Sequence, residues 1–140
     1  MPAVFDFPHT VRPEEIDALG HANNVAYVAW MQAAAVAHSE AQGWPGVRYQ
    51  RLGQGWVVRA HHIEYLQPAE LHDRILIRTW VASMKKATSL RRYRILRPED
   101  GALLATAETR WAFIDYATGQ PVRIPAEVAQ AFTVVEADPP

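Results

Sequence analysis

The sequence predicts an α+β fold in which one long helix lies across an antiparallel β-sheet. Two observations support this prediction. Residues 24–42 hold seven alanines and no glycine or proline, a composition typical of a helix. Four later segments are rich in branched and aromatic residues and alternate between apolar and polar positions, as strands do. Short turns join these four segments, which favours antiparallel pairing.

The N-terminal third predicts a strand, a loop and the helix, in that order. Residues 3–12 alternate weakly and predict the first strand, and the polar residues 13–23 predict a loop. Asn23 or Asn24 can cap the start of helix 24–42, and Gly43 is placed to end it. The apolar stripe of this helix consists of Tyr27, Trp30, Met31, Ala34 and His38.

The rest of the chain predicts four strands, at residues 55–66, 73–83, 88–97 and 102–115, and a short helix over 125–132 opened by a proline. In the second of these strands, one face carries Ile75, Ile77, Thr79, Val81 and Ser83.

All elements fit one domain spanning residues 1–140. A five-stranded sheet has two edges, so we expect one edge to pair with a second copy of the chain in a homodimer.

Composition excludes several classes of function. Lys and Arg number 14 against 15 Asp and Glu, so no broad basic surface exists for nucleic acid or an anionic membrane. No apolar run approaches the roughly 20 residues that span a bilayer. The absence of cysteine excludes disulfides, thiolate metal sites and a cysteine nucleophile. Without a signal peptide pattern or a metal-ligand spacing, we expect a cytoplasmic protein that holds no metal.

The segment from Asp17 to Tyr27 is the strongest candidate for chemistry. It places a carboxylate, a glycine and polar side chains just before a long helix. The first amides of a helix are free and partly positive, so they can stabilise an oxyanion, while a nearby carboxylate acts as base or nucleophile. The alternative is structural, because Asp17 and the two asparagines can equally cap and shape the loop.

Two other groups of residues carry open alternatives. His61 and His62 lie on opposite faces of their strand, and His62 with Glu64 could perform acid–base chemistry or pack against arginines. A basic cluster around the turn near residues 84–88 could bind a phosphate or be a solvated turn. It consists of Lys85, Lys86, Arg91 and Arg92.

Three stretches together resemble a known family. The first joins Val11-Arg12 to Asp17, Gly20, His21, Asn23, Asn24 and Tyr27; the second runs from Ile63 to Ala69 with Asp73; the third joins residues 111–115 to Thr118-Gly119 and Arg123-Ile124-Pro125. They span residues 11–125. In them the chain resembles the hotdog-fold acyl-CoA thioesterases of the 4-hydroxybenzoyl-CoA thioesterase type.

The resemblance implies that a sheet wraps around the long helix, and that two chains, often paired again into a tetramer, form active sites at their interface. It implies hydrolysis of an acyl-CoA to a free acid and CoA, with CoA as part of the substrate and no separate cofactor. Asp17 would act as nucleophile or base, helix amides near Asn24, Val25 and Ala26 would polarise the thioester, and Tyr27 would border the site.

Further contacts follow from the same resemblance. We expect the substrate to meet His21, Asn23, Ala26, Trp30 and His62. CoA phosphates would meet Lys85, Lys86 and Arg91. Some relatives carry a histidine where this chain has Asn24, so a mechanism that requires it is not available here. The remaining alternatives are a hotdog hydratase or dehydratase using His62 and Glu64, and a non-catalytic module that binds acyl thioesters.

Overall fold

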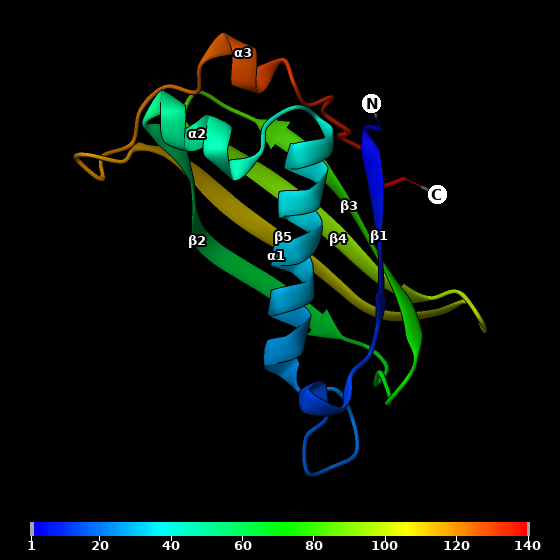
Figure 1. The fold of residues 1–140 in the computed structure, drawn as a ribbon. Helices are drawn as coiled ribbons and strands as arrows, with labels where there is room; N and C mark the ends of the chain where they lie inside the picture. The colour runs from blue at the N-terminus through cyan, green and yellow to red at the C-terminus, as the bar shows by residue number, and fades with distance from the viewer. Residues whose placement is uncertain (1, 140) are drawn as a thin grey trace.

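The computed structural model describes residues 2–139 and contains all the strands and the long helix that the sequence predicts (Figure 1). The strands are β1 (Val4–Thr10), β2 (Gln54–Tyr65), β3 (Arg74–Met84), β4 (Thr88–Arg97) and β5 (Ala102–Asp115). The helices are α1 (Asn24–Ala41), α2 (Gly46–Leu52) and α3 (Ala126–Ala129), with a 3-10 turn, η1, at Pro13–Glu15.

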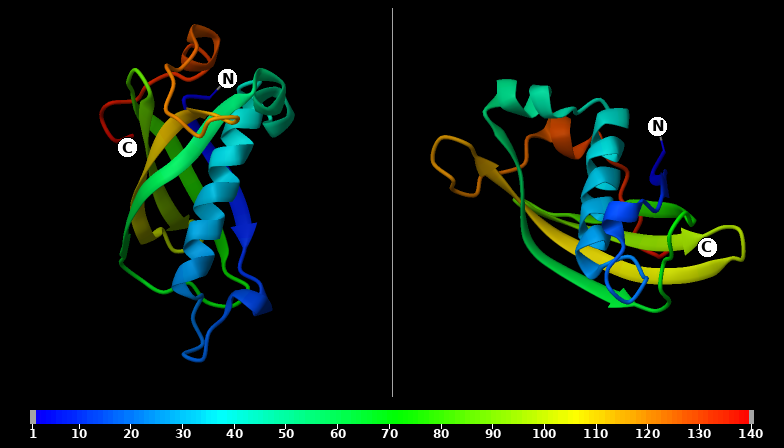
Figure 2. Two further views of the ribbon diagram at one scale, coloured as in Figure 1. Left: turned by 90° about the vertical axis from the view of Figure 1, so that its left-hand side faces the viewer. Right: turned by 60° about the horizontal axis from the view of Figure 1, so that its bottom comes forward.

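The five strands form one antiparallel sheet in the order β1-β3-β4-β5-β2. The sheet curves, and α1 lies along its concave face (Figure 2). This face carries the buried side of each strand, so we call it the inner face. The predicted α+β class and the arrangement of a sheet around a long helix are both confirmed.

The predicted apolar stripe of α1 is its buried side. Tyr27, Trp30, Met31, Ala34 and His38 are all buried. Most of this stripe packs with the inner face of the sheet in one core cluster that includes Ile77, Ile95 and Leu104. Alanines let the helix approach the sheet closely because their side chains are small. The stripe therefore fixes which side of α1 faces the sheet.

A second core cluster lies beyond the C-terminal end of α1, and the sequence did not predict the helix that helps to form it. Helix α2 begins after Pro45 and ends at Gly53, whose φ of +76° suits glycine. Trp44 and Tyr49 pack there against Phe113 and Phe132. The predicted C-terminal helix over 125–132 is also present, but only over Ala126–Ala129.

Strand β2 is an edge of the sheet. It pairs with β5 on one side, and its other side has no strand partner within residues 2–139. From Arg59 to Tyr65, six of the seven residues are exposed, so both faces of this half of the strand meet solvent. An open strand edge offers unpaired backbone groups to another chain.

Candidate active site

The predicted loop before α1 is closed at its base by backbone hydrogen bonds. The Asn23 amide and the Asn23 Nδ2 group both donate to the Glu15 carbonyl, at 2.8 and 3.0 Å. One residue further into the loop from each side, Ile16 and Ala22 form an antiparallel bridge. These contacts hold Asp17 in the short loop that leads directly into the N-terminus of α1 (Figure 1).

Asp17 lies at the start of a tight turn with its side chain exposed. Its Oδ1 accepts from the Leu19 amide at 2.9 Å, and its own amide donates to the His21 carbonyl at 2.8 Å. Gly20 has a φ of +82°, a conformation that a residue with a Cβ adopts only with strain. Asp17 Oδ2 has no hydrogen-bond partner among the described residues, so one carboxylate oxygen is free to act on a ligand.

Asn23, one of the two predicted candidates, is the N-cap of α1. Its Oδ1 accepts from the Ala26 amide at 2.9 Å, which follows the usual capping geometry. The amides of Asn24 and Val25 have no acceptor within the described chain, and Val25 is 69% exposed. Two free amides therefore face solvent at the partly positive end of the helix.

Hydrogen bonds within the chain engage two of the groups that were expected to meet the substrate at the helix start. The Ala26 amide is occupied by the cap, so Asn24 and Val25 alone retain free amides for an oxyanion. Asn23 uses both ends of its side chain inside the loop, which makes it a capping residue rather than a substrate contact. His21 is half-buried, and its backbone bridges to Glu70.

Glu15 anchors the loop, and the sequence did not single it out. Its carboxylate is buried and accepts from His9 Nε2 at 2.9 Å, the Arg12 amide at 2.8 Å and Trp30 Nε1 at 2.7 Å. Burial alone would raise the pKa of Glu15, but these hydrogen bonds outweigh it and the pKa is lowered. One carboxylate thus ties β1, the loop and α1 together.

Trp30 and Tyr27 belong to this support. Trp30 is 3% exposed and donates to Glu15, while the Tyr27 hydroxyl accepts from the Ala69 amide at 3.2 Å. Their rings pack with centroids 4.7 Å apart. We expected Trp30 to contact substrate and Tyr27 to border the site. Both side chains are buried and hydrogen-bonded, so within this chain they support the loop, and their contact with substrate stays a prediction. Ala26 is buried as well.

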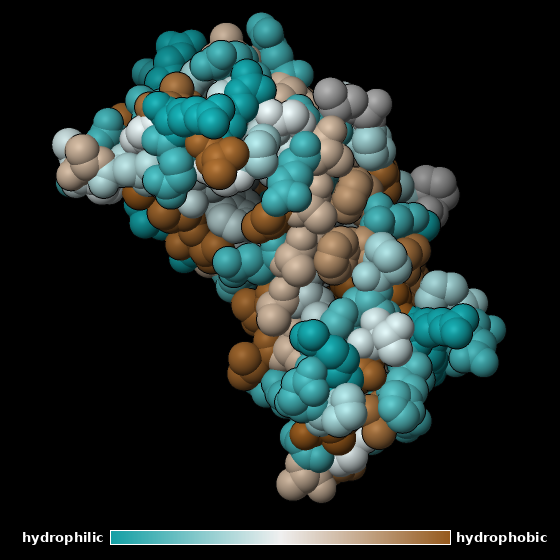
Figure 3. Space-filling view, viewed as in Figure 1, coloured by the Kyte–Doolittle hydropathy of each residue, from teal (hydrophilic) through white to brown (hydrophobic). Residues whose placement is uncertain are grey.

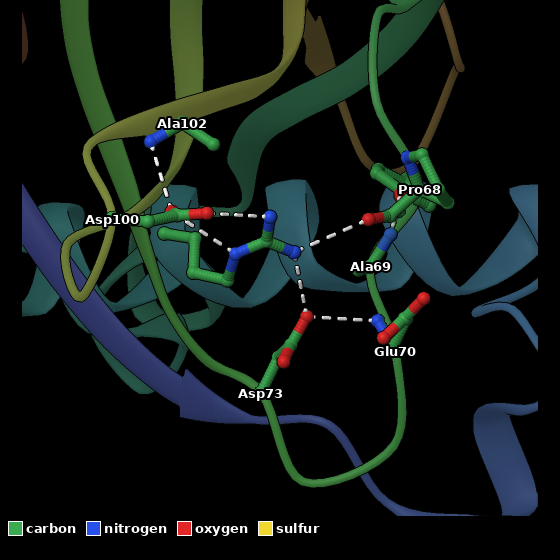
Figure 4. A network of polar contacts seen from close by, with 8 residues as sticks. Pro68, Ala69, Glu70, Asp73, Asp100 and Ala102 are labelled. Carbon is green, nitrogen blue, oxygen red and sulfur yellow. Dashed lines mark hydrogen bonds and ion pairs between the residues drawn. The ribbon is translucent and has the colours of Figure 1, made fainter.

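The segment after β2 is held by a network of polar contacts (Figure 4). Arg97 donates to Asp73 at 2.9 Å and to both oxygens of Asp100, and Asp73 accepts from the Glu70 amide at 2.9 Å. The segment held in this way contacts the loop because the Ala22 amide donates to the Ala69 carbonyl at 2.8 Å. A network of surface ion pairs therefore fixes the position of the site.

His62 does not join the other candidates. Ile63 packs against the inner core, so its neighbours His62 and Glu64 point from the outer face of the sheet. Both are exposed, and their closest atoms are 3.4 Å apart. His61 instead lies on the inner side, where its Nδ1 contacts Thr109 Oγ1 at 2.8 Å and burial lowers its pKa. Within one chain, His62 therefore lies on the other side of the sheet from the helix start, and its expected contact with substrate stays a prediction.

The basic cluster is divided by the fold. Lys85 and Lys86 are exposed in the β3–β4 turn, and the Lys86 carbonyl accepts from the Ile124 amide near α3. This turn lies at the end of the molecule opposite the Asp17 loop (Figure 1). Arg91 is buried at 6% exposure and bonded to other side chains, which corrects the expectation that it meets a phosphate at the surface.

Within residues 2–139, no three His, Cys, Asp or Glu side chains come close enough together to hold a metal ion. In that part of the chain no helix is both long and apolar enough to cross a membrane. Near the helix start, Asp17 and His21 share a backbone hydrogen bond, and Asn24 and Val25 begin α1 a few residues later.

Comparisons with known proteins identify the family. Residues 11–132 match the model of the thioesterase-like superfamily. The acyl-CoA thioesterase YbgC of Haemophilus influenzae is 29% identical over 131 residues, which cover 91% of this chain and 93% of that protein.

Two solved structures share the fold over nearly their whole length. The hypothetical protein TT1821 from Thermus thermophilus has a TM-score of 0.84 and 27% identity over 91% of this chain and 96% of its own. Slr0204, a 1,4-dihydroxy-2-naphthoyl-CoA thioesterase from Synechocystis, has a TM-score of 0.85 and 18% identity over 91% and 94%. Because the family model spans most of the sequence, this chain belongs to the thioesterase-like superfamily.

Proposed function

We propose that this protein is an acyl-CoA thioesterase of the 4-hydroxybenzoyl-CoA type, which hydrolyses an acyl-CoA to a free acid and CoA. The observation that carries the proposal is the exposed Asp17 carboxylate in the loop that leads to the free amides of Asn24 and Val25. The name of the H. influenzae relative, an acyl-CoA thioesterase, supports the substrate class.

Asp17 can act by either of two routes. As a base, it takes a proton from water while the water oxygen attacks the thioester carbon; the C–S bond then breaks and CoA leaves as the thiolate. As a nucleophile, it forms an acyl anhydride as CoA leaves, and water then hydrolyses the anhydride to release the acid. In both routes the Asn24 and Val25 amides stabilise the oxyanion. A positioned base contributes about 10²–10⁴-fold and one oxyanion donor about 10²–10³-fold.

The active unit in this proposal is a homodimer, with a dimer of dimers as the larger assembly. Lys85 and Lys86, the proposed contacts of the CoA phosphates, lie at the opposite end of the chain from Asp17, so a complete site combines two chains. The open edge of β2 supports pairing. The exposed side of α1 also carries the small apolar residues Ala29, Ala33, Val36 and Ala37 (Figure 3), as surfaces between proteins often do.

The remaining parts of the proposal concern the whole protein. Residues 1–140 form one thioesterase domain, which works in the cytoplasm. It uses no cofactor and no metal, because CoA arrives with the substrate and a thioester is already activated. Nucleic acid and membranes are not partners.

The test is a panel of acyl-CoA esters with detection of the released thiol, run on the wild type and on Asp17→Asn. Asparagine keeps the acceptor for the Leu19 amide, so the variant is expected to fold and assemble normally while turnover falls at least about 10²-fold. Glu14→Gln is the matched control, because Glu14 is exposed in the same loop and pairs only with Arg12.

Each alternative gives a different result. Asp17→Asn with wild-type turnover would remove Asp17 from the mechanism. Conversion of an enoyl or hydroxyacyl thioester without thiol release would indicate the hydratase that uses His62 and Glu64. Binding of acyl-CoA without turnover, even at high enzyme concentration, would indicate a binding module.

A further inference from the structure

A cavity of about 220 Å³ lies between the second half of α1, α2 and the inner face of the sheet. Its walls carry several aromatic side chains, among them Trp44, Tyr49, Trp56, Trp111 and Phe132. None of its lining residues belongs to the Asp17 loop or to the first turns of α1. Helix α1 has 18 residues and is about 27 Å long, so the cavity and the Asp17 of the same chain lie well apart.

One wall of this cavity carries a buried positive charge. Arg91 is 6% exposed and lines the cavity from β4. Its Nη1 group donates to His38 Nδ1 at 2.9 Å and to Thr79 Oγ1 at 3.1 Å. No carboxylate of the described chain forms an ion pair with it. A guanidinium keeps its charge at physiological pH, and a buried charge without a counterion is costly.

The acceptors of Arg91 do not neutralise this charge. His38 Nε2 contacts the Pro2 carbonyl at 2.9 Å, and a carbonyl can only accept, so Nε2 carries the proton and Nδ1 is the acceptor for Arg91. Burial and the Arg91 charge lower the pKa of His38 to about 4, which keeps the ring neutral at neutral pH. Thr79 is also neutral.

The other edge of the guanidinium is free. We find no acceptor for Arg91 Nε or Nη2 among residues 2–139. These two N–H groups form the fork that matches the two oxygens of a carboxylate. A phosphate or a CoA headgroup carries more charge than one arginine balances and does not suit aromatic walls. The cavity is somewhat larger than the roughly 150 Å³ known to hold benzene in an apolar protein interior.

We propose that this cavity binds a small apolar monocarboxylate, of about the size of one aromatic ring with its carboxyl group, whose carboxylate pairs with the Nε–Nη2 edge of Arg91. The ring or short aliphatic chain lies among the aromatic walls. The proposal concerns binding of a free acid, so it does not depend on thioesterase activity and can be tested without turnover.

The experiment is calorimetric titration of the full chain with benzoate and with its neutral analogue benzamide. We expect benzoate to bind once per chain and at least about tenfold more tightly than benzamide, because only the carboxylate pairs with the charge of Arg91. Arg91→Met keeps an unbranched side chain without the guanidinium and should remove this preference. The control Arg92→Met, on the outer face of the same strand, should keep the preference for benzoate over benzamide.

A second variant tests the cavity itself and keeps the experiment decisive if Arg91→Met does not fold. Ala35 lines the cavity from α1, so Ala35→Leu fills part of it and should abolish binding of both ligands. The proposal is overturned if wild type binds no benzoate, if benzoate and benzamide bind equally, or if Ala35→Leu leaves benzoate affinity unchanged.

Discussion

The two ends of helix α1 differ in how their polar groups are placed. At the N-terminal end, Asp17 and the amides of Asn24 and Val25 are exposed, and the side-chain hydrogen bonds of Asp17 and Asn23 join residues two to eight positions apart. At the C-terminal end, His38 and Arg91 are buried, and their hydrogen bond joins residues 53 positions apart. The first end offers reactive groups to solvent, whereas the second holds a charge inside the protein.

The largest effect on stability is expected at the N-terminal end, from Glu15→Ala. The change leaves His9, the Arg12 amide and Trp30 without their shared acceptor, and we expect a loss of about 4 kcal/mol of unfolding free energy. Urea unfolding measures it, with the exposed Glu14→Ala as control at under about 0.5 kcal/mol. Equal losses in the two variants would show that Glu15 is not the anchor of this end.

The next effect concerns pH at the C-terminal end. The pKa of His38 is lowered to about 4 by burial and by Arg91, so the unfolded state takes up a proton at higher pH than the folded state does. His38 therefore makes its full contribution to the free energy of unfolding above about pH 6.5. As pH falls towards 4, the free energy of unfolding decreases by on the order of 3 kcal/mol.

His38→Gln isolates this effect, because an amide can accept from Arg91 and donate to the Pro2 carbonyl without titrating. Unfolding free energies measured between pH 7 and 4 should fall less steeply for the variant than for the wild type. Parallel curves for the two proteins would mean that His38 titrates normally in the folded state.

A smaller effect is expected from the cap at the N-terminal end. Asn23→Ala removes both side-chain hydrogen bonds and should cost about 1 kcal/mol of stability. Asn23→Ser keeps an acceptor for the Ala26 amide and sets no second acceptor against the Glu15 carbonyl, so it should lose less. Thermal unfolding compares the two, and a loss as large for serine as for alanine would contradict the capping role.

The smallest effect is expected at the β3–β4 turn. Replacing Lys85 and Lys86 together with alanine should raise the KM for acyl-CoA a few-fold, since exposed charge contacts contribute roughly 0.2–1 kcal/mol, while kcat changes little. Added salt should reduce the difference from wild type. Arg74→Ala, at the exposed opposite end of β3, is the control. If the double change leaves KM unaltered, the turn does not contribute to CoA binding.

The sequence predicted the features that depend on local pattern. The five strands, the alanine-rich helix and the Asn23 cap all follow from residues close together in the chain. Helix α2 was missed because seven residues that begin with Gly46 and are followed by Gly53 show no helical period. The burial of Arg91 was missed because alternation along β4 shows which residues share a face, but only packing against α1 shows that this face, with its arginine, lies inside.

The Asp17 loop shows, within one site, the same difference between what local pattern predicts and what only tertiary packing decides. Its exposed carboxylate and free amides were expected from residue types before a helix. The role of Glu15 was not expected, because two glutamates after a proline look like an ordinary polar loop. Only the approach of β1 and Trp30 surrounds one of them with donors while leaving the other in water.

The open edge of β2 has a consequence for the behaviour of the protein on dilution. If a second copy covers this edge, folding and assembly are linked by mass action, and the midpoint of thermal unfolding rises with protein concentration. At low protein concentration the edge of β2 then stays uncovered. Its unpaired backbone groups can pair with any extended peptide, and aggregation can begin there. The abundance of the protein in the cell thereby becomes one of the factors that keep it folded.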